Sequence, residues 1–354
     1  MPLVAHNDLP TFKRLSEEGQ RILSPNFAQK QDIRELHIGL LNMMPDSALE
    51  ATERQFFRLV GACNQIAQFH VHPFFIEGIE RCSEAKAYLA KHYESFDQIK
   101  HDGLDALIIS GANITQAQLP DESFWPYLTE VFDWAKQNVT STICSCLATH
   151  ALIEYCHGIK RTHLGEKRWG VFSHSVIQRT HPLVSDINTR FDVPHSRFNE
   201  VFRSDIEAAG LRVLVESEMA GVHLATSSDG FRVIYFQGHP EYDNISLLKE
   251  YKREVLRFIH AESDQYPPYP KDYFGEKTLQ LLDIYKQRVI SAAIIDRPGF
   301  EFPESEIIQS LDITWHDTTK AVFNNWLGRV YQVTHQDRRI PFMDTVDPNN
   351  PLGL

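Results

Sequence analysis

The sequence predicts an α/β protein with a mostly parallel β-sheet, helices on both faces, an antiparallel extension and a C-terminal helical segment. Two observations support this fold class. Between residues 35 and 160, apolar β-branched runs alternate with amphipathic helical stretches, and strand–helix alternation produces parallel sheets covered on both faces. From Trp169 to Phe236 the runs are short and separated by turns, which is typical of antiparallel strands.

The first half of the chain supplies the parallel strands. Hydrophobic periodicity and turn residues predict strands over 36–41, 69–76, 104–110 and 139–144, and helices over 47–61, 83–92, 124–138 and from 147 onward. Functional sites in such sheets lie at the carboxyl ends of the strands. We therefore expect three strand ends to converge, at Asn42–Pro45, Gly111–Asn113 and Cys146.

The remaining chain is predicted to be largely helical, with helices over 245–262, 275–293 and 316–331. These patterns suggest four parts: an N-terminal arm on the surface (1–34), the α/β domain (35–265), a C-terminal helical segment packing on that domain (266–336) and a mobile Pro/Asn-rich tail (337–354).

Composition excludes several classes of protein. The chain has 354 residues, a net charge of −12 and no Lys/Arg-rich run, so we expect no nucleic-acid partner. No apolar run approaches the roughly 18 residues of a membrane span. Five cysteines, an odd number, and an N-terminus without a basic-then-apolar pattern argue against secretion. We expect a cytoplasmic protein, and because no His/Cys spacing matches a zinc site, no metal.

The stretch from Val139 to Ile153 changes from strand to helix at a two-residue corner, Ser145-Cys146. Small side chains flank the corner at Cys144 and Ala148. A side chain at such a corner is held above the strand ends, and the N-terminus of the following helix favours a thiolate. The pattern indicates a nucleophilic Cys146, with two buried cysteines at a strand end as the alternative.

A thiol nucleophile needs a base and a group that orients the base. The run over 233–236 predicts a strand, and Gly238, His239, Pro240 and Glu241 follow it. A histidine at this sheet edge can meet the thiol, with Glu241 holding the imidazole. The alternative is a loop histidine beside a surface glutamate. Likewise, the polar cluster over 194–197 is by itself more typical of a capped turn than of a pocket.

Taken together, these segments resemble the homoserine O-acyltransferases of methionine synthesis, which share the class I glutamine amidotransferase fold. The resemblance extends from about Gln31 to Asp337. Its markers are Leu41-Asn-Met-Met-Pro, Thr52-Glu-Arg-Gln-Phe, Trp134-Ala-Lys-Gln-Asn-Val-Thr-Ser-Thr, Gly170-Val-Phe-Ser-His, Pro194-His-Ser-Arg, Gly238-His-Pro-Glu-Tyr-Asp and Asn325-Trp-Leu.

The resemblance implies an O-acyltransferase that moves an acyl group from acyl-CoA to L-homoserine through a cysteine thioester. Cys146 would be the nucleophile, His239 the proton acceptor and Glu241 the third catalytic member. The residues implied to contact substrate are Lys167, Ser196 and Arg253. We expect backbone N–H groups near Gly111 and Leu147 to stabilise the oxyanion.

The acyl donor is the open question at the sequence level. The family position that distinguishes donors corresponds to Thr115, which brings no negative charge to repel a succinyl carboxylate and has a hydroxyl that can donate to it. Succinyl-CoA is therefore favoured over acetyl-CoA. We expect no cofactor beyond the acyl-CoA substrate, and a homodimer.

The chain departs from the family pattern at Asp46-Ser47, where a lysine pair is usual, at Leu147, where tryptophan is common, and in a longer 274–314 segment. These departures leave three alternatives: transfer to serine or another hydroxy amino acid, a glutaminase suggested by the fold alone, and a catalytically silent binding protein.

Overall fold

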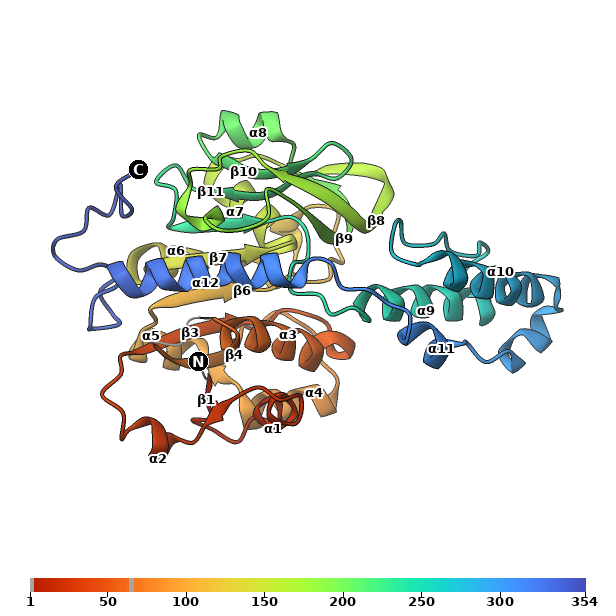
Figure 1. Cartoon of the computed structure of the whole chain (residues 1–354), viewed down its shortest axis with the longest axis horizontal. Helices are drawn as coiled ribbons and strands as arrows, with labels where there is room; N and C mark the ends of the chain where they lie inside the picture. The colour runs from red at the N-terminus through yellow and green to blue at the C-terminus, as the bar shows by residue number, and fades with distance from the viewer. Residues whose placement is uncertain (1–2, 64–66) are drawn as a thin grey trace.

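The computed structural model describes residues 3–63 and 67–354, which form one large mixed β-sheet with helices packed around it (Figure 1). The described strands follow the order β2-β1-β4-β3-β6-β7-β12-β11-β10-β8-β9, and β5 pairs with β4. The strands are β1 (Leu3–Val4), β2 (Ile22–Leu23), β3 (Glu35–Leu41), β4 (Gln68–Phe75), β5 (Glu94–Ser95), β6 (Ala106–Ile109), β7 (Ser141–Ser145), β8 (Thr162–Val176), β9 (Arg190–Glu200), β10 (Arg212–Ser217), β11 (Gly221–Thr226) and β12 (Val233–Phe236).

The helices connect and cover these strands. They are α1 (Pro10–Glu17), α2 (Pro25–Ala28), α3 (Leu49–Gly61), α4 (Ser83–His92), α5 (Phe96–Asp102), α6 (Trp125–Asn138), α7 (Leu147–His157), α8 (Arg203–Ala208), α9 (Ser246–Ile259), α10 (Glu276–Ser291), α11 (Glu304–Ile308) and α12 (His316–Val333). The short 3₁₀ turns are η1 (Asp46–Ala48), η2 (Leu119–Asp121), η3 (Pro182–Val184) and η4 (Ile294–Gly299).

The sheet is parallel in one half and antiparallel in the other. Every pairing from β2 to β12 is parallel, and β11, β10, β8 and β9 extend it with antiparallel pairings. This arrangement confirms the predicted fold class. Along the chain the antiparallel portion begins with β8 at Thr162, close to the predicted change in pattern at Trp169.

Two hydrophobic clusters cover the two faces of the sheet. On one face, α1, α3 and α12 pack Phe57, Phe323 and Trp326 against Ile38 of β3. On the other, α5, α6 and α7 pack against β6 and β7, with Leu128 in the cluster. Because both faces are buried, the central strands are almost continuously apolar, which is the signal that made them predictable from sequence.

The N-terminal residues do more than wrap the surface. Leu3 pairs with Phe69 of β4 and with Ile22 of β2, so the segment predicted as an arm adds two short parallel strands to the sheet edge. Leu3 and Val4 are fully buried. Two-residue strands carry too little periodicity to be seen in the sequence, whereas pairing with β4 satisfies their backbone groups.

The C-terminal helical region is divided between two places. Helices α9, α10 and α11 project together to one side of the body, whereas α12 runs back across it (Figure 1). A separate hydrophobic cluster, which includes Tyr251, Leu282 and Trp315, joins α9 to α10. The expected boundary at 265/266 thus falls inside this projecting lobe, and Phe342 of the predicted tail lies in the main core. The four-part division itself stays a prediction.

The described helices include none with the length and hydropathy of a membrane-crossing segment.

Candidate active site

The strand β7 ends in a sharp turn at Cys146, which is followed at once by α7. Cys146 has φ 51° and ψ −107°, a conformation that costs energy in a residue with a side chain and is found mainly at functional sites. Its N–H donates to Phe236 O at 2.7 Å, which fixes the turn against β12. Cys146 is partly exposed, whereas Cys144 is completely buried. The alternative of two buried cysteines therefore holds for Cys144 alone.

Strand pairing brings His239 to Cys146. β12 runs parallel to β7 with Phe236 opposite Ser145, so the residues that follow each strand emerge at the same edge of the sheet. The His239 imidazole lies within hydrogen-bonding range of the Cys146 sulfur, and its Nδ1 lies 2.8 Å from Glu241 Oε1. The predicted sulfur–imidazole–carboxylate arrangement is therefore present.

The charges of this triad favour a protonated imidazole. Burial by itself lowers the pKa of His239, but the negative charges of Cys146 and Glu241 and their hydrogen bonds to the ring raise it well above its ordinary value. An imidazolium beside a sulfur stabilises the thiolate, which is the nucleophilic form. The second oxygen of Glu241, Oε2, is buried without a hydrogen-bond partner among the described residues.

Gly238 allows His239 to approach this closely. A Cβ at Gly238 would lie 2.8 Å from Val193 Cγ1 and 2.9 Å from His195 Nε2, which no side chain tolerates without movement. The backbone of the next residue is held in place because His239 N–H donates to Pro194 O at 2.8 Å. Strand β9 thus packs closely behind His239.

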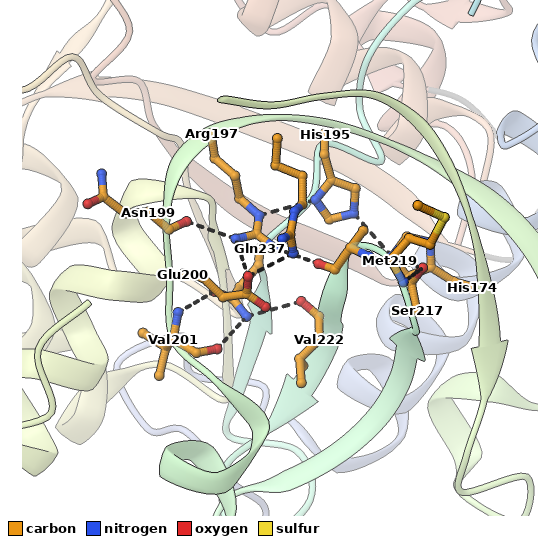
Figure 2. A network of polar contacts seen from close by, with 12 residues as sticks. His174, His195, Arg197, Asn199, Glu200, Val201, Ser217, Met219, Val222 and Gln237 are labelled. Atoms are coloured by element: carbon orange, nitrogen blue, oxygen red, sulfur yellow. Dashed lines mark hydrogen bonds and ion pairs between the residues drawn. The ribbon is translucent and has the colours of Figure 1, made fainter. Parts of the chain in front are cut away.

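A network of buried polar side chains holds strand β9 in place behind His239 (Figure 2). Arg197 Nη2 donates to Ala220 O at 2.6 Å and its Nε lies 3.3 Å from His195 Nδ1. Gln237, just before Gly238, donates to Val201 O and Val222 O at 3.0 Å each. The cluster predicted as a capped turn is therefore part of strand β9, and Arg197 is buried within the network.

Glu250 of α9 joins two of the expected substrate contacts. Lys167 Nζ lies 2.9 Å from Glu250 Oε2, and Ser196 Oγ donates to the same oxygen at 2.6 Å. Tyr242 OH donates to Glu250 Oε1 at 2.8 Å, and the Tyr242 ring stacks on His239 with centroids 4.3 Å apart. Burial by itself raises the pKa of Glu250, but Lys167 and these hydrogen bonds lower it overall. Sequence reasoning missed Glu250, which resembles any charged residue on an amphipathic helix.

The third expected contact, Arg253, lies one turn further along α9 and is exposed. Its Nε is 3.3 Å from Glu254 Oε1. Arg253 and Lys167 line a cleft of about 930 Å³ between β8 and the projecting lobe, with Trp169 and Lys271. Lys167 Nζ sits 4.2 Å from the centroid of the Trp169 ring. The structure thus places Lys167 and Arg253 on one cleft, and Ser196 shares the Glu250 carboxylate with Lys167.

The three predicted strand ends do meet. Gly111, after β6, lies so close to the elbow that a Cβ there would be 3.6 Å from Cys146 Cβ and 3.7 Å from Met44 Sδ. Ser110 ties two of these ends together, since its Oγ accepts from Met43 N–H and donates to Gly111 O. Leu147 is the first residue of α7, and first-turn N–H groups have no acceptor within the helix. The oxyanion role of Gly111 and Leu147 remains a prediction.

Thr115 is engaged differently from the expectation. Its hydroxyl donates to Glu122 Oε2 at 3.0 Å and its N–H donates to Glu122 Oε1 at 2.6 Å. The hydroxyl proton is therefore already used within the loop and is not free for a succinyl carboxylate in this conformation. Thr115 and Glu122 line a cavity of about 690 Å³ with Met43 and Asp46. The role of Thr115 in donor choice stays a prediction.

Sequence reasoning did not identify Arg81 and Arg161, because the groups with which they interact are distant in sequence. Arg81 donates to Met44 O and to Asp46 Oδ1, and so holds the loop after β3. Burial lowers the pKa of the Arg161 guanidinium, while the charges of Glu154, Cys146 and Glu122 act to raise it. Arg161 is therefore a half-buried cation within electrostatic range of Cys146.

Comparison with known proteins identifies the family. A family model described as homoserine O-succinyltransferase matches residues 2–336. The chain belongs to this family. Two relatives named homoserine O-succinyltransferase, from Methylobacter tundripaludum and Methylococcus capsulatus, are 70% and 66% identical over 354 residues and align over 100% of both chains. The family resemblance stated from the motifs is confirmed.

Among solved structures, a glutamine amidotransferase from Methylobacillus flagellatus matches with a TM-score of 0.46 and 13% identity, covering 84% of this chain and 95% of its own. Another, from Thermotoga maritima, matches with a TM-score of 0.39 and 10% identity, covering 85% and 98%. Because both TM-scores are below 0.5, we assign the fold class from the strand order and strand pairing of this chain.

Proposed function

We propose that this enzyme transfers a succinyl group from succinyl-CoA to the hydroxyl of L-homoserine, a step of methionine biosynthesis, through a thioester on Cys146. Full-length relatives at 70% and 66% identity carry the name of that reaction. The observation that supports the covalent route is the strained elbow at Cys146 with His239 and Glu241 beside it.

In the first half-reaction the Cys146 thiolate attacks the carbonyl carbon of the thioester. A new C–S bond forms and the carbonyl oxygen becomes an oxyanion beside Gly111 and the first turn of α7. When the oxyanion collapses, the bond to the sulfur of CoA breaks. The His239 imidazolium gives its proton to the departing CoA thiolate and becomes neutral, while Glu241 keeps the ring oriented.

In the second half-reaction the neutral His239 takes the proton of the homoserine hydroxyl. The hydroxyl oxygen attacks the acyl carbon on Cys146, and a second oxyanion forms at the same place. Collapse breaks the C–S bond, releases the O-acylated product and restores the thiolate beside the imidazolium. Each proton that His239 gives up is thus recovered within one turnover.

The charges near the cleft suit a zwitterionic amino acid. Homoserine carries an ammonium and a carboxylate, and the Glu250 carboxylate and the Arg253 guanidinium are one helical turn apart on α9. Arg253 can bind a carboxylate through two parallel hydrogen bonds. Glu250, already held by Lys167 and Ser196, supplies the opposite charge for the ammonium.

Single-turnover mass spectrometry tests the covalent step. Wild type mixed with succinyl-CoA alone should gain about one succinyl group per chain, located on Cys146. The Cys144→Ala variant is the matched control, because it removes the neighbouring buried thiol and should still be acylated. Product formation by Cys146→Ala, or a wild type that forms product without ever becoming acylated, would refute this route.

A matrix of donors and acceptors tests the substrates. We expect the highest kcat/KM with succinyl-CoA and homoserine, and lower values with acetyl-CoA or with serine. A preference for acetyl-CoA or serine would overturn the substrate assignment while leaving the thioester chemistry intact.

We also propose that the enzyme requires no added cofactor, works in the cytoplasm and forms a homodimer. Activity after dialysis, cell fractionation and light scattering test these three points.

A further inference from the structure

Four histidines and two glutamates gather beside the amino half of β3 and the middle of β4. His37 of β3 pairs in register with His70 of β4. Because side chains two residues apart in a strand share a face, Glu35 lies on the same face as His37, and His72 on the same face as His70. Cys146 and the other site loops follow the carboxyl ends of the strands, so this cluster lies away from the chemistry proposed above.

Three members of this cluster have the arrangement of metal ligands. One ring nitrogen of His6, one of His72 and a carboxylate oxygen of Glu94 all lie within 4.8 Å of one another. His6 follows β1, His72 belongs to β4 and Glu94 to β5. Two imidazoles and a carboxylate are donors typical of zinc and related divalent metals, and a zinc site with three protein ligands leaves a fourth position for water.

The hydrogen bonds leave the required lone pairs available. His6 Nδ1 lies 3.2 Å from Val4 O, so this nitrogen carries the proton and Nε2 carries the lone pair. Asn7 Nδ2 lies 3.4 Å from Nε2, a long contact that a metal ion would replace. His72 Nδ1 lies 2.7 Å from Glu94 Oε1. Ligands at about 2.0–2.2 Å from a metal ion need this pair to separate by only about half an ångström.

The surrounding residues orient His72 as a ligand. His72 Nε2 lies 2.8 Å from His37 Nδ1, and His37 Nε2 lies 3.4 Å from Glu35 Oε2. If His72 Nδ1 binds the metal, its Nε2–H donates to His37, whose own Nε2–H points to Glu35. Such a relay from a metal-bound histidine to a carboxylate is a common way of fixing the tautomer and orientation of the ligand.

Hydrogen bonding favours this triad over a second one. Glu35, His37 and His70 also offer three ligand atoms within 4.8 Å, but His37 Nδ1 lies 2.8 Å from His72 Nε2 and His37 Nε2 lies 3.4 Å from Glu35 Oε2. Both ring nitrogens of His37 are thus engaged by neighbouring side chains, which suits a positioning role. Side-chain exposures of 15% for His72 and 26% for Glu94 leave a path from solvent.

We propose that His6, His72 and Glu94 bind one divalent transition-metal ion of the zinc class, with His37 positioning His72. The ion would join the segment after β1 to β4 and β5, and so stabilise the sheet edge formed by the N-terminal residues. The sequence did not indicate this site because its ligands come from three separate segments without a local spacing motif.

Untagged full-length protein, stripped with a chelator, should take up about one Zn²⁺ per chain in equilibrium dialysis with elemental analysis. Co²⁺ in place of Zn²⁺ should give visible d–d absorption, and Zn²⁺ should raise the Tm. Glu94→Gln keeps an acceptor for His72 but removes the anionic ligand, and should weaken binding by more than tenfold. His37→Gln should weaken it by about 10- to 100-fold, as loss of a positioning partner does.

His101→Gln is the matched control. His101 Nδ1 lies 2.8 Å from Asp102 Oδ1, an exposed pair of the same kind as His72–Glu94 but outside the three-ligand groups, so binding should be unchanged. If Glu94→Gln does not fold, His6→Gln gives the same test from the N-terminal segment. The proposal is overturned if wild type binds no stoichiometric Zn²⁺ or Co²⁺, or if Glu94→Gln and His6→Gln bind as wild type does.

Discussion

Replacing Gly238 with alanine should displace His239, the proposed proton acceptor, without changing any side chain of the proposed triad. The added Cβ would lie 2.8 Å from Val193 Cγ1 and 2.9 Å from His195 Cε1, whereas ordinary carbon contacts are about 3.5–4.0 Å. Strand β9 is packed on a buried polar network, so the residue pair 238–239 must move by roughly 0.7 Å. A misplacement of about 1 Å costs about 100-fold in rate, and we expect kcat/KM to fall about 10- to 100-fold.

The same overlap should lower stability by about 1–3 kcal/mol, the usual cost of overpacking a core. Steady-state kinetics at saturating donor and thermal unfolding measure the two effects. Gly328→Ala in α12 is the control, because a Cβ there meets nothing within 4 Å; it should leave kcat/KM unchanged and raise stability slightly. A Gly238→Ala enzyme within twofold of wild-type kcat/KM would show that the close approach does not position His239.

Three further predictions concern charge. Cys146→Ala removes a negative charge that stabilises the His239 imidazolium, so the pKa of His239 should fall; histidine NMR measures it, and an unchanged pKa would mean that the thiolate is not its partner. Burial lowers the pKa of His150 to about 3 and that of His174 to about 4. The unfolded chain therefore binds more protons below pH 6.5, and urea unfolding should show a loss of about 1 kcal/mol per ring between pH 7.5 and 5.5; equal stabilities at the two pH values would contradict this. Arg161→Gln removes a half-buried cation near the nucleophile, so we expect KM to rise about tenfold for succinyl-CoA but not for acetyl-CoA, whose acyl group has no carboxylate; equal effects on both donors would contradict this pairing.

Local patterns determined much of the architecture. The strands β3, β6 and β7 and the helices α4 and α6 lie within a few residues of their predicted bounds, because strands buried on both faces are continuously apolar and amphipathic helices repeat every 3.6 residues. The corner at Cys146 was visible for the same reason, since a β-branched run changes to a helical one there. Parallel pairing then implied that the strand ends converge.

The tertiary structure alone decided which side chains meet. Glu250 reaches Lys167 and Ser196 from another part of the chain, and His6 reaches His72 through two-residue strands with no periodicity of their own. Gly238 showed its importance only once Val193 lay against it. Periodicity along the chain reports which face of an element is buried, whereas contacts between polar groups depend on register and packing, and these are fixed only when the whole sheet assembles.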